Sequence, residues 1–180
     1  MRIRLLVFLL LSASLMSGCG YHQIQADDEQ VVASASEFIA LSRRRADQVP
    51  NLIQVVHTYA PNEREALSRV KVAQDSVAEH TPTKADSSNG RDAMREFSDG
   101  NMQLSQAIER LLAVAENYPA LKADANFRDI EAQMEGAETH LDAARGRYAD
   151  AVAAYNAAIG TFPGRVTALL MGAKPRDALR

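Results

Sequence analysis

The sequence predicts an all-α protein, namely an elongated antiparallel four-helix bundle with a short C-terminal tail helix. Two observations lead to this prediction. The composition favours helices over sheets, since the 180-residue chain has only 9 Gly and 6 Pro, has no Trp and is rich in Ala. Apolar residues also recur at every third or fourth position between Phe127 and Ile159, the spacing that places side chains on one face of an α-helix.

This C-terminal helix is the element around which we expect the other helices to pack. Its apolar positions are Phe127, Ile130, Met134, Ala137, Leu141, Ala144, Tyr148, Val152, Tyr155 and Ile159. At 1.5 Å per residue the helix would be about 50 Å long. It therefore needs partner helices of similar length to bury its apolar face.

Residues 1–18 have the features of an export signal. Two arginines precede an apolar segment that begins at Leu5, and small residues follow that segment up to Gly18. The apolar segment is shorter than the ~20 residues that are needed to cross a bilayer. We therefore predict a signal peptide rather than a transmembrane helix.

The single cysteine, Cys19, directly follows this segment. Leu15–Cys19 resembles a bacterial lipobox, in which small residues allow cleavage before a cysteine that becomes the lipid-modified N-terminus. One cysteine cannot form an internal disulfide, so its position calls for another explanation. We expect acyl chains such as palmitate on Cys19 to anchor the protein to a membrane. The alternatives are an ordinary cleaved signal and an uncleaved anchor.

Two further expectations follow from this assignment. Gly20 is not the Asp that retains Gram-negative lipoproteins at the inner membrane, so in a Gram-negative source we expect the outer membrane, facing the periplasm. Cleavage would change the formal net charge from −3 to −5, because residues 1–18 contain two arginines. No basic patch with interleaved aromatic residues is visible, so we expect no nucleic-acid partner.

Four amphipathic helices are expected in the mature chain. Asp27 or Asp28 should cap the first helix, Pro50 should kink it, and Pro61 should begin the second. The expected helices span about 27–60, 61–80, 92–117 and 124–160, followed by a tail helix from Pro163. The chain thus divides into a signal peptide (1–18), a tether (19–26), a helical bundle (27–176) and a tail (177–180), with a mobile loop at 81–90.

Several separated segments resemble the LemA family. They are Arg43–Ile53, Tyr59–Glu63, Leu104–Ala123, and Tyr155-Asn156 before Phe162-Pro163. The resemblance covers about residues 20–176 and implies an elongated four-helix bundle that an N-terminal segment holds at a membrane. It implies no biochemical activity, because none is established for the family.

A polar network is expected inside the bundle. Arg44, Arg45 and Asp47 are charged residues that lie next to the apolar positions of the first expected helix. A buried guanidinium needs a carboxylate partner, and Glu116 and Glu138 on later helices are the candidates. Their expected role is structural, fixing the register between helices; an anionic-ligand site and a catalytic site are the alternatives.

One further polar residue belongs to this predicted network. Asn51 follows Pro50, where its side chain can satisfy backbone groups that the kink releases.

No constellation for catalysis or metal binding is apparent. The four histidines, His22, His57, His80 and His140, lack the i, i+4 pairing and the Glu-x-x-His spacing of metal sites in helical bundles. The chain offers no Ser-His-Asp arrangement and no glycine-rich phosphate loop. We therefore expect no catalytic residues, no metal and no cofactor.

The sequence is thus most consistent with an anchored cell-envelope lipoprotein that binds or scaffolds an envelope protein and is not an enzyme. A small-ligand or lipid-binding bundle is one alternative, and it would need an apolar cavity between the helices. An enzyme with a polar site around Arg45, Glu116 and Glu138 is the other, and it would need shifted carboxylates in an open cleft.

Overall fold

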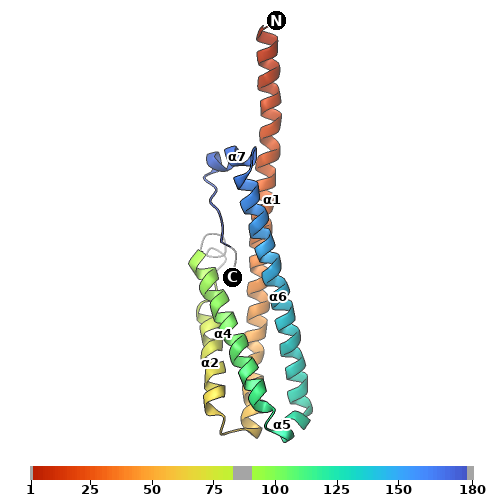
Figure 1. Cartoon of the computed structure of the whole chain (residues 1–180), viewed down its shortest axis with the longest axis vertical. Helices are drawn as coiled ribbons and strands as arrows, with labels where there is room; N and C mark the ends of the chain where they lie inside the picture. Colours follow the sequence, from red (N-terminus) through yellow and green to blue (C-terminus); the bar gives the residue numbers. More distant parts are fainter. Residues whose placement is uncertain (1, 83–90, 178–180) are drawn as a thin grey trace. The chain divides into compact units, whose positions relative to one another are not determined.

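The computed structural model describes residues 2–82 and 91–177, with side chains from Tyr21 to Pro82 and from Asp92 onward. All regular secondary structure in these residues is helical, which confirms the all-α class (Figure 1). The helices are α1 (Arg2–Tyr59), α2 (Arg64–Glu79), α4 (Arg91–Ala115), α5 (Pro119–Ala123), α6 (Ala125–Gly160) and α7 (Gly164–Met171). Residues 83–90 of the predicted loop lie outside the described residues.

The chain forms two compact units. Unit 1 comprises Met1–Ser34 and Arg147–Ala178, and unit 2 comprises Ala35–Gly146. The two longest helices, α1 and α6, therefore contribute residues to both units.

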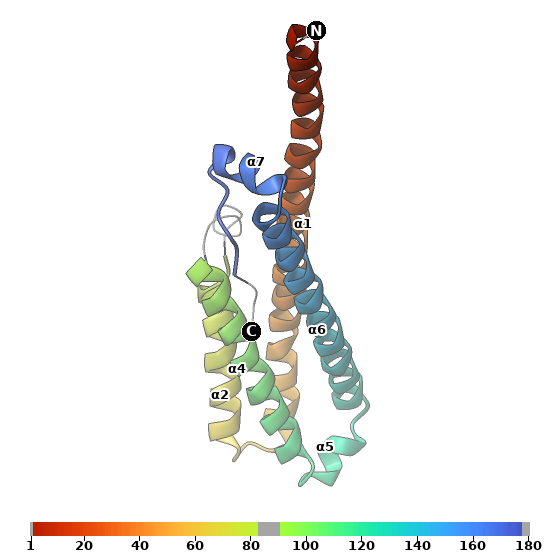
Figure 2. The same cartoon turned by 45° about the horizontal axis from the view of Figure 1, so that its top comes forward.

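Unit 2 contains α2, α4, α5 and parts of α1 and α6. Helices α2 and α4 lie side by side and run in opposite directions (Figures 1 and 2). The core of this unit includes Phe38 and Phe97, whose rings meet edge to face with centroids 5.6 Å apart. Unit 1 contains α7 and the remaining parts of α1 and α6, and its core includes Ile24, Val31 and Tyr155.

The predicted apolar face of α6 is confirmed. Nine of its ten residues are buried, and Ala137 is half-buried. Asp124 precedes the helix, and its Oδ1 accepts a hydrogen bond of 2.9 Å from the backbone N–H of Phe127. This is the bond by which an N-cap residue satisfies a free N–H in the first helical turn.

The N-cap predicted at Asp27 or Asp28 is wrong, because α1 continues through both residues. Gln23 Nε2 donates to Asp27 Oδ1 at 2.9 Å, and such a pair four residues apart supports a helix. Ile24 is buried, so this turn also gains packing energy. Residues 21–26 of the predicted tether are accordingly helical. Helix α1 also continues through Pro50.

Two predicted helix boundaries differ from the structure. Pro61 does not begin α2; it lies in a turn in which the backbone N–H of Glu63 donates to Ala60 O at 3.1 Å. Proline is favoured at the second position of such a turn because its φ is already suitable. Helix α4 ends at Ala115, slightly before the expected residue 117, and Pro119 begins the short helix α5, which the sequence analysis missed.

Candidate functional site

The core of unit 2 includes the charged side chain of Arg45, which is only 1% exposed. Arg45 lies on the same face of α1 as the buried residues Phe38, Ser42, Val49 and Leu52, which follow one another at intervals of three or four residues. The helical period therefore directs a charged side chain into the core.

Three helices supply the partners of this guanidinium. Arg45 Nη1 donates to Glu138 of α6 in an ion pair and to Ser105 Oγ of α4 at 2.7 Å. Arg45 Nη2 donates to the backbone O and to the Oδ1 of Asn101, both at 3.1 Å. Ser105 Oγ in turn donates to Glu138 Oε1 at 2.8 Å. We call Arg45, Asn101, Ser105 and Glu138 the arginine cluster.

The orientation of the Asn101 side chain is fixed by the backbone of the preceding turn of α4. Its Nδ2 donates to Phe97 O at 2.8 Å, which leaves Oδ1 free to accept from Arg45. Arg45 Nε is buried and has no hydrogen-bond partner among the described residues. Four of the five donor hydrogens of a guanidinium lie on its two terminal nitrogens, Nη1 and Nη2. The partners of Arg45 therefore bind these two nitrogens.

Burial and neighbouring charges act in opposite directions on the pKa of Arg45. Burial lowers this pKa, and Arg145 lowers it further, whereas Glu138 and Asp142 raise it; the net shift is downward. Arginine nevertheless remains charged at neutral pH. Glu138 is 35% exposed, so the cluster reaches solvent through the carboxylate rather than through the guanidinium.

A second arginine lies in the same region of unit 2. The guanidinium carbon of Arg145 is 5.8 Å from the ring centroid of Phe38, within the range of a cation–π interaction. Arg145 Nη1 also pairs with Asp142 Oδ1 at 3.3 Å. The guanidinium groups of Arg45 and Arg145 therefore both interact with side chains of unit 2.

The structure brings together only two of the predicted network residues, Arg45 and Glu138. The prediction that Glu116 joins them is wrong, because Glu116 is exposed and binds Lys122 Nζ at 2.6 Å instead. Arg44, Asp47 and Asn51 are exposed side chains of α1 and lie outside the arginine cluster. They point away from the core because they fall between its helical positions.

Sequence reasoning missed Asn101 and Ser105. Both lie one turn apart on α4, in the register of its buried residues Phe97, Leu104 and Ile108. Their signal in the sequence was a polar residue at a position where the helical pattern predicts an apolar one. Such a residue indicates a hydrogen-bond partner, because buried polar groups are almost always hydrogen-bonded.

Two tyrosine–carboxylate hydrogen bonds connect the segments around α5 to those around α2. Tyr59 Oη donates to Asp124 Oδ2 at 2.8 Å, and Tyr118 Oη donates to Glu63 Oε1 at 2.7 Å. These bonds raise the pKa of both tyrosines. The bonds from Phe127 N–H and Tyr59 lower the pKa of Asp124.

Unit 1 has a polar contact of its own, at the end of the chain. Asn156 Nδ2 donates to Arg176 O at 2.7 Å, and Arg176 N–H donates to Asn156 Oδ1 at 2.8 Å. The Arg176 guanidinium pairs with Asp28 at 2.6 Å and lies 5.3 Å from the ring centroid of Tyr155. The segment after α7 is therefore held against α6 and α1.

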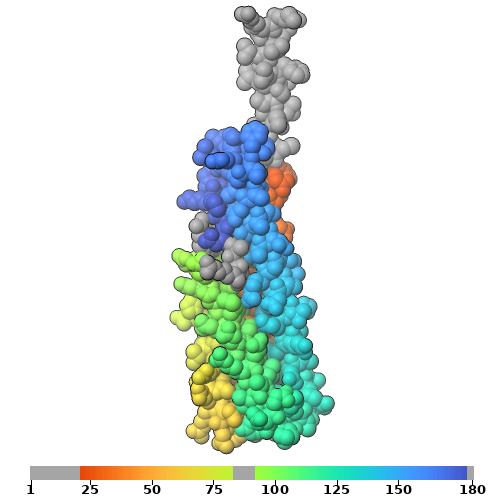
Figure 3. Space-filling model, in the orientation of Figure 1, coloured from red at the N-terminus to blue at the C-terminus, as the bar shows by residue number. Residues whose placement is uncertain are grey.

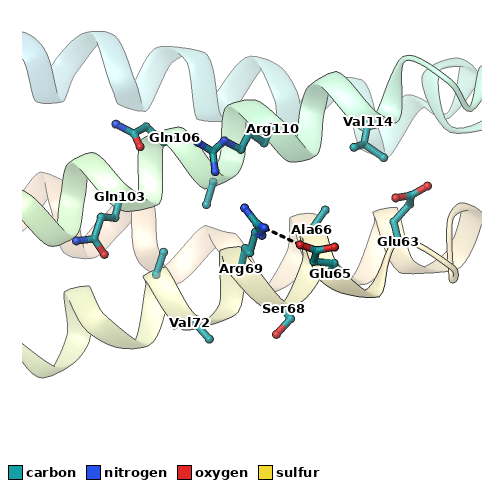
Figure 4. Close-up of a pocket in the computed structure, with 12 residues that line it drawn as sticks. Glu63, Glu65, Ala66, Ser68, Arg69, Val72, Gln103, Gln106, Arg110 and Val114 are labelled. Carbon is teal, nitrogen blue, oxygen red and sulfur yellow. Dashed lines mark hydrogen bonds and ion pairs between the residues drawn. The ribbon is translucent and has the colours of Figure 1, made fainter.

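A groove of about 570 Å³ lies between α2 and α4 in unit 2 (Figure 4). Arg69 of α2 and Arg110 of α4 extend into the space between the two helices, and Arg69 pairs with Glu65 at 2.5 Å. The groove is lined by charged, amide and small apolar side chains. It is an open surface groove and not the enclosed apolar cavity that a bundle binding a small ligand or lipid would need.

The side chain of Cys19 lies outside the described residues. Among those described, no helix has both the length and the apolar character to cross a membrane. The same residues contain no group of three or more His, Cys, Asp or Glu side chains placed to hold a metal ion.

The arginine cluster, the two tyrosine bonds and the Arg176 contact all involve segments that carry the resemblance described above. No curated protein matches this chain. The model of the LemA family matches residues 35–180, which is most of the chain. The chain belongs to the LemA family.

Proposed function

We propose that this protein is a cell-envelope lipoprotein, anchored to a membrane by acyl chains on Cys19, that acts as a non-enzymatic binding or scaffold protein. The observation that carries the proposal is the Leu15–Cys19 pattern, with the only cysteine of the chain directly after an export signal. Two or more acyl chains give stable membrane attachment, because each buried CH₂ contributes about 0.8 kcal/mol.

The geometry of the arginine cluster supports a scaffold over an enzyme. Arg45 is buried and its terminal nitrogens are engaged by protein groups, so it is not available to a substrate. A catalytic group must be within hydrogen-bond reach of a substrate atom. The cluster is better suited to fixing α1, α4 and α6 relative to one another within unit 2.

The α2–α4 groove is the surface that we propose for an envelope protein partner. Photo-crosslinking in living cells can test this directly, with the reactive residue placed at Gln106 in the groove and, as a control, at the exposed Glu135 of α6. We expect one reproducible adduct from Gln106 and none from Glu135. The same adducts from both positions, or none from either, would contradict the proposed surface.

The membrane assignment has a separate test. In a Gram-negative host we expect the full chain in the outer-membrane fraction of a density gradient, and Gly20→Asp should move it to the inner-membrane fraction. Recovery of the wild-type chain as a soluble protein would remove the anchor from the proposal, and the ligand-binding and enzymatic alternatives would then come first.

A further inference from the structure

Helix α7 in unit 1 has an unusual distribution of side chains. Its buried residues are the small ones, Gly164 and Ala168. Its large apolar residues point outward: Leu169 is 82% exposed, Leu170 is 84% exposed and Val166 is 54% exposed. A surface helix of a water-soluble protein normally has the opposite arrangement.

The outward residues form one apolar stripe. Val166, Leu169 and Leu170 are spaced three and four residues apart, so they share one face of roughly 100°. Phe162, which is 79% exposed, lies in the turn just before the helix and adds a further exposed apolar side chain to this segment. We call these four residues the α7 stripe; in Figure 3 the α7 segment is part of the visible surface.

The charged residues nearest to the stripe along the chain are basic. Arg165, Lys174 and Arg176 lie between the acidic residues Asp150 and Asp177, and residues 151–176 contain no Asp or Glu. Arg176 is used in the contact with Asp28, whereas Arg165 and Lys174 are exposed. Basic residues beside an apolar helix face are typical of segments that lie in the interface of a bilayer with anionic headgroups.

The position of α7 along the chain brings it close to the proposed anchor. A methyl group at Gly164 would lie 3.8 Å from Cδ1 of Ile24, so the start of α7 packs on this part of α1. Ile24 is five residues from Cys19, which allows a separation of at most about 18 Å even for an extended chain. Acyl chains on Cys19 would therefore hold α7 near the lipid headgroups.

We propose that the α7 stripe inserts into the interfacial region of the membrane to which Cys19 is anchored. This inference rests on the proposed function, because the anchor supplies the proximity. The occupant of the stripe is a bilayer surface that contains anionic phospholipid, with the helix lying in the plane of the interface. Unit 1 would then be the membrane-contacting part of the protein.

The absence of tryptophan from the chain allows a direct test. The full chain is purified from membranes as Leu170→Trp and, as a matched control, as Val72→Trp, whose position on α2 in unit 2 is 65% exposed. Each protein is reconstituted into vesicles of phosphatidylethanolamine and phosphatidylglycerol, with or without brominated phosphatidylcholine as a quencher. Both replaced side chains are exposed, so melting curves should match the wild type.

We expect brominated lipid to reduce the emission of Leu170→Trp several-fold relative to that of Val72→Trp. Equal emission from both variants, in vesicles that carry the protein on flotation, would overturn the insertion of α7 while leaving the anchor intact. Failure of both proteins to float would overturn the two proposals together. Intact mass of the same samples reports acylation separately, so quenching without acylation would support α7 and refute the anchor.

Discussion

Arg45 places a full charge in the core of unit 2, and its neighbours determine whether that charge is tolerated. Removing an ion from water costs several kcal/mol, and an ion pair offsets this cost only when further hydrogen bonds complete the geometry. Glu138 supplies the charge, while Asn101 and Ser105 supply three of the acceptor contacts. The cluster therefore favours the one helix register in which all four residues meet.

Loss of the Glu138 charge should therefore destabilise the protein. We expect Glu138→Gln to lower the free energy of unfolding by about 2 kcal/mol, because the variant keeps the shape of the side chain but leaves the Arg45 charge uncompensated. This is less than for a fully buried partner, since Glu138 is 35% exposed. Urea denaturation measures the change.

A matched control is available at Glu116, whose pairing with Lys122 is at the surface. Glu116→Gln should change the free energy of unfolding by no more than about 0.5 kcal/mol, because exposed ion pairs contribute little. Equal effects of the two substitutions would contradict a special role for the arginine cluster.

Part of this site could be predicted from the sequence. An arginine in an apolar helical register demands a carboxylate, and Glu138 was one of two candidates. Linear sequence could not choose between Glu138 and Glu116, because the choice depends on how α4 and α6 are aligned in space. Nor could it assign partners to Asn101 and Ser105, because Ser and Asn in a helix can also bond to their own backbone.

Asp124 should contribute a pH-dependent part of the stability. Its pKa is lowered in the folded state, so its contribution is complete above the ordinary value of 3.8 and is lost as the pH falls through the folded-state pKa. We expect the free energy of unfolding to fall less steeply for Asp124→Asn than for the wild type between about pH 5 and about pH 2.

Asp129 provides the control for that titration. It is an exposed carboxylate near the start of the same helix, and Asp129→Asn leaves the bonds from Tyr59 and Phe127 to Asp124 intact. The variant should keep the acid-dependent loss of the wild type. If the free energy of unfolding of Asp124→Asn falls with decreasing pH as steeply as that of the wild type, these hydrogen bonds do not contribute to acid sensitivity.

At the scale of elements, apolar periodicity predicted α6 well because the helix buries one continuous face. Two of the errors lie at prolines, where the same residue can stop a helix, start one or occupy a turn. Pro61 and Pro119 are such cases, and only the backbone hydrogen bonds around them distinguish the outcomes. The sequence shows the helical spacing of Val166, Leu169 and Leu170, but it could not show that these residues face outward.

The join between α6 and α7 depends on a glycine. A Cβ at Gly164 would lie 2.1 Å from the carbonyl oxygen of Ala158, closer than any such contact in real proteins. We expect Gly164→Ala to destabilise the docking of α7 by about 1–3 kcal/mol, which is typical of overpacking. Hydrogen exchange of the α7 amides measures this directly.

Gly160 at the end of α6 is the matched control, since a Cβ there would meet no atom within 4 Å. Gly160→Ala should leave the protection of the α7 amides unchanged. Similar loss of protection in both variants would mean that glycine flexibility, rather than the close approach to Ala158, holds α7 in place.

At the scale of the whole molecule, the two units have different proposed tasks. Unit 2 contains the arginine cluster and the α2–α4 groove, where we propose that a partner binds. Unit 1 contains the α7 stripe and the segment that leads from the proposed anchor. Both proposed tasks depend on the acylation of Cys19, and the packing of the helices does not test that modification.

The most direct measurement is therefore the intact mass of the native protein extracted from the membranes of cells that express the full chain. We predict a mass equal to residues 19–180 plus acyl groups, and a Cys19→Ala protein that retains residues 1–18 without acylation. A native protein that begins at another residue, or that carries an unmodified Cys19, would contradict the lipoprotein account.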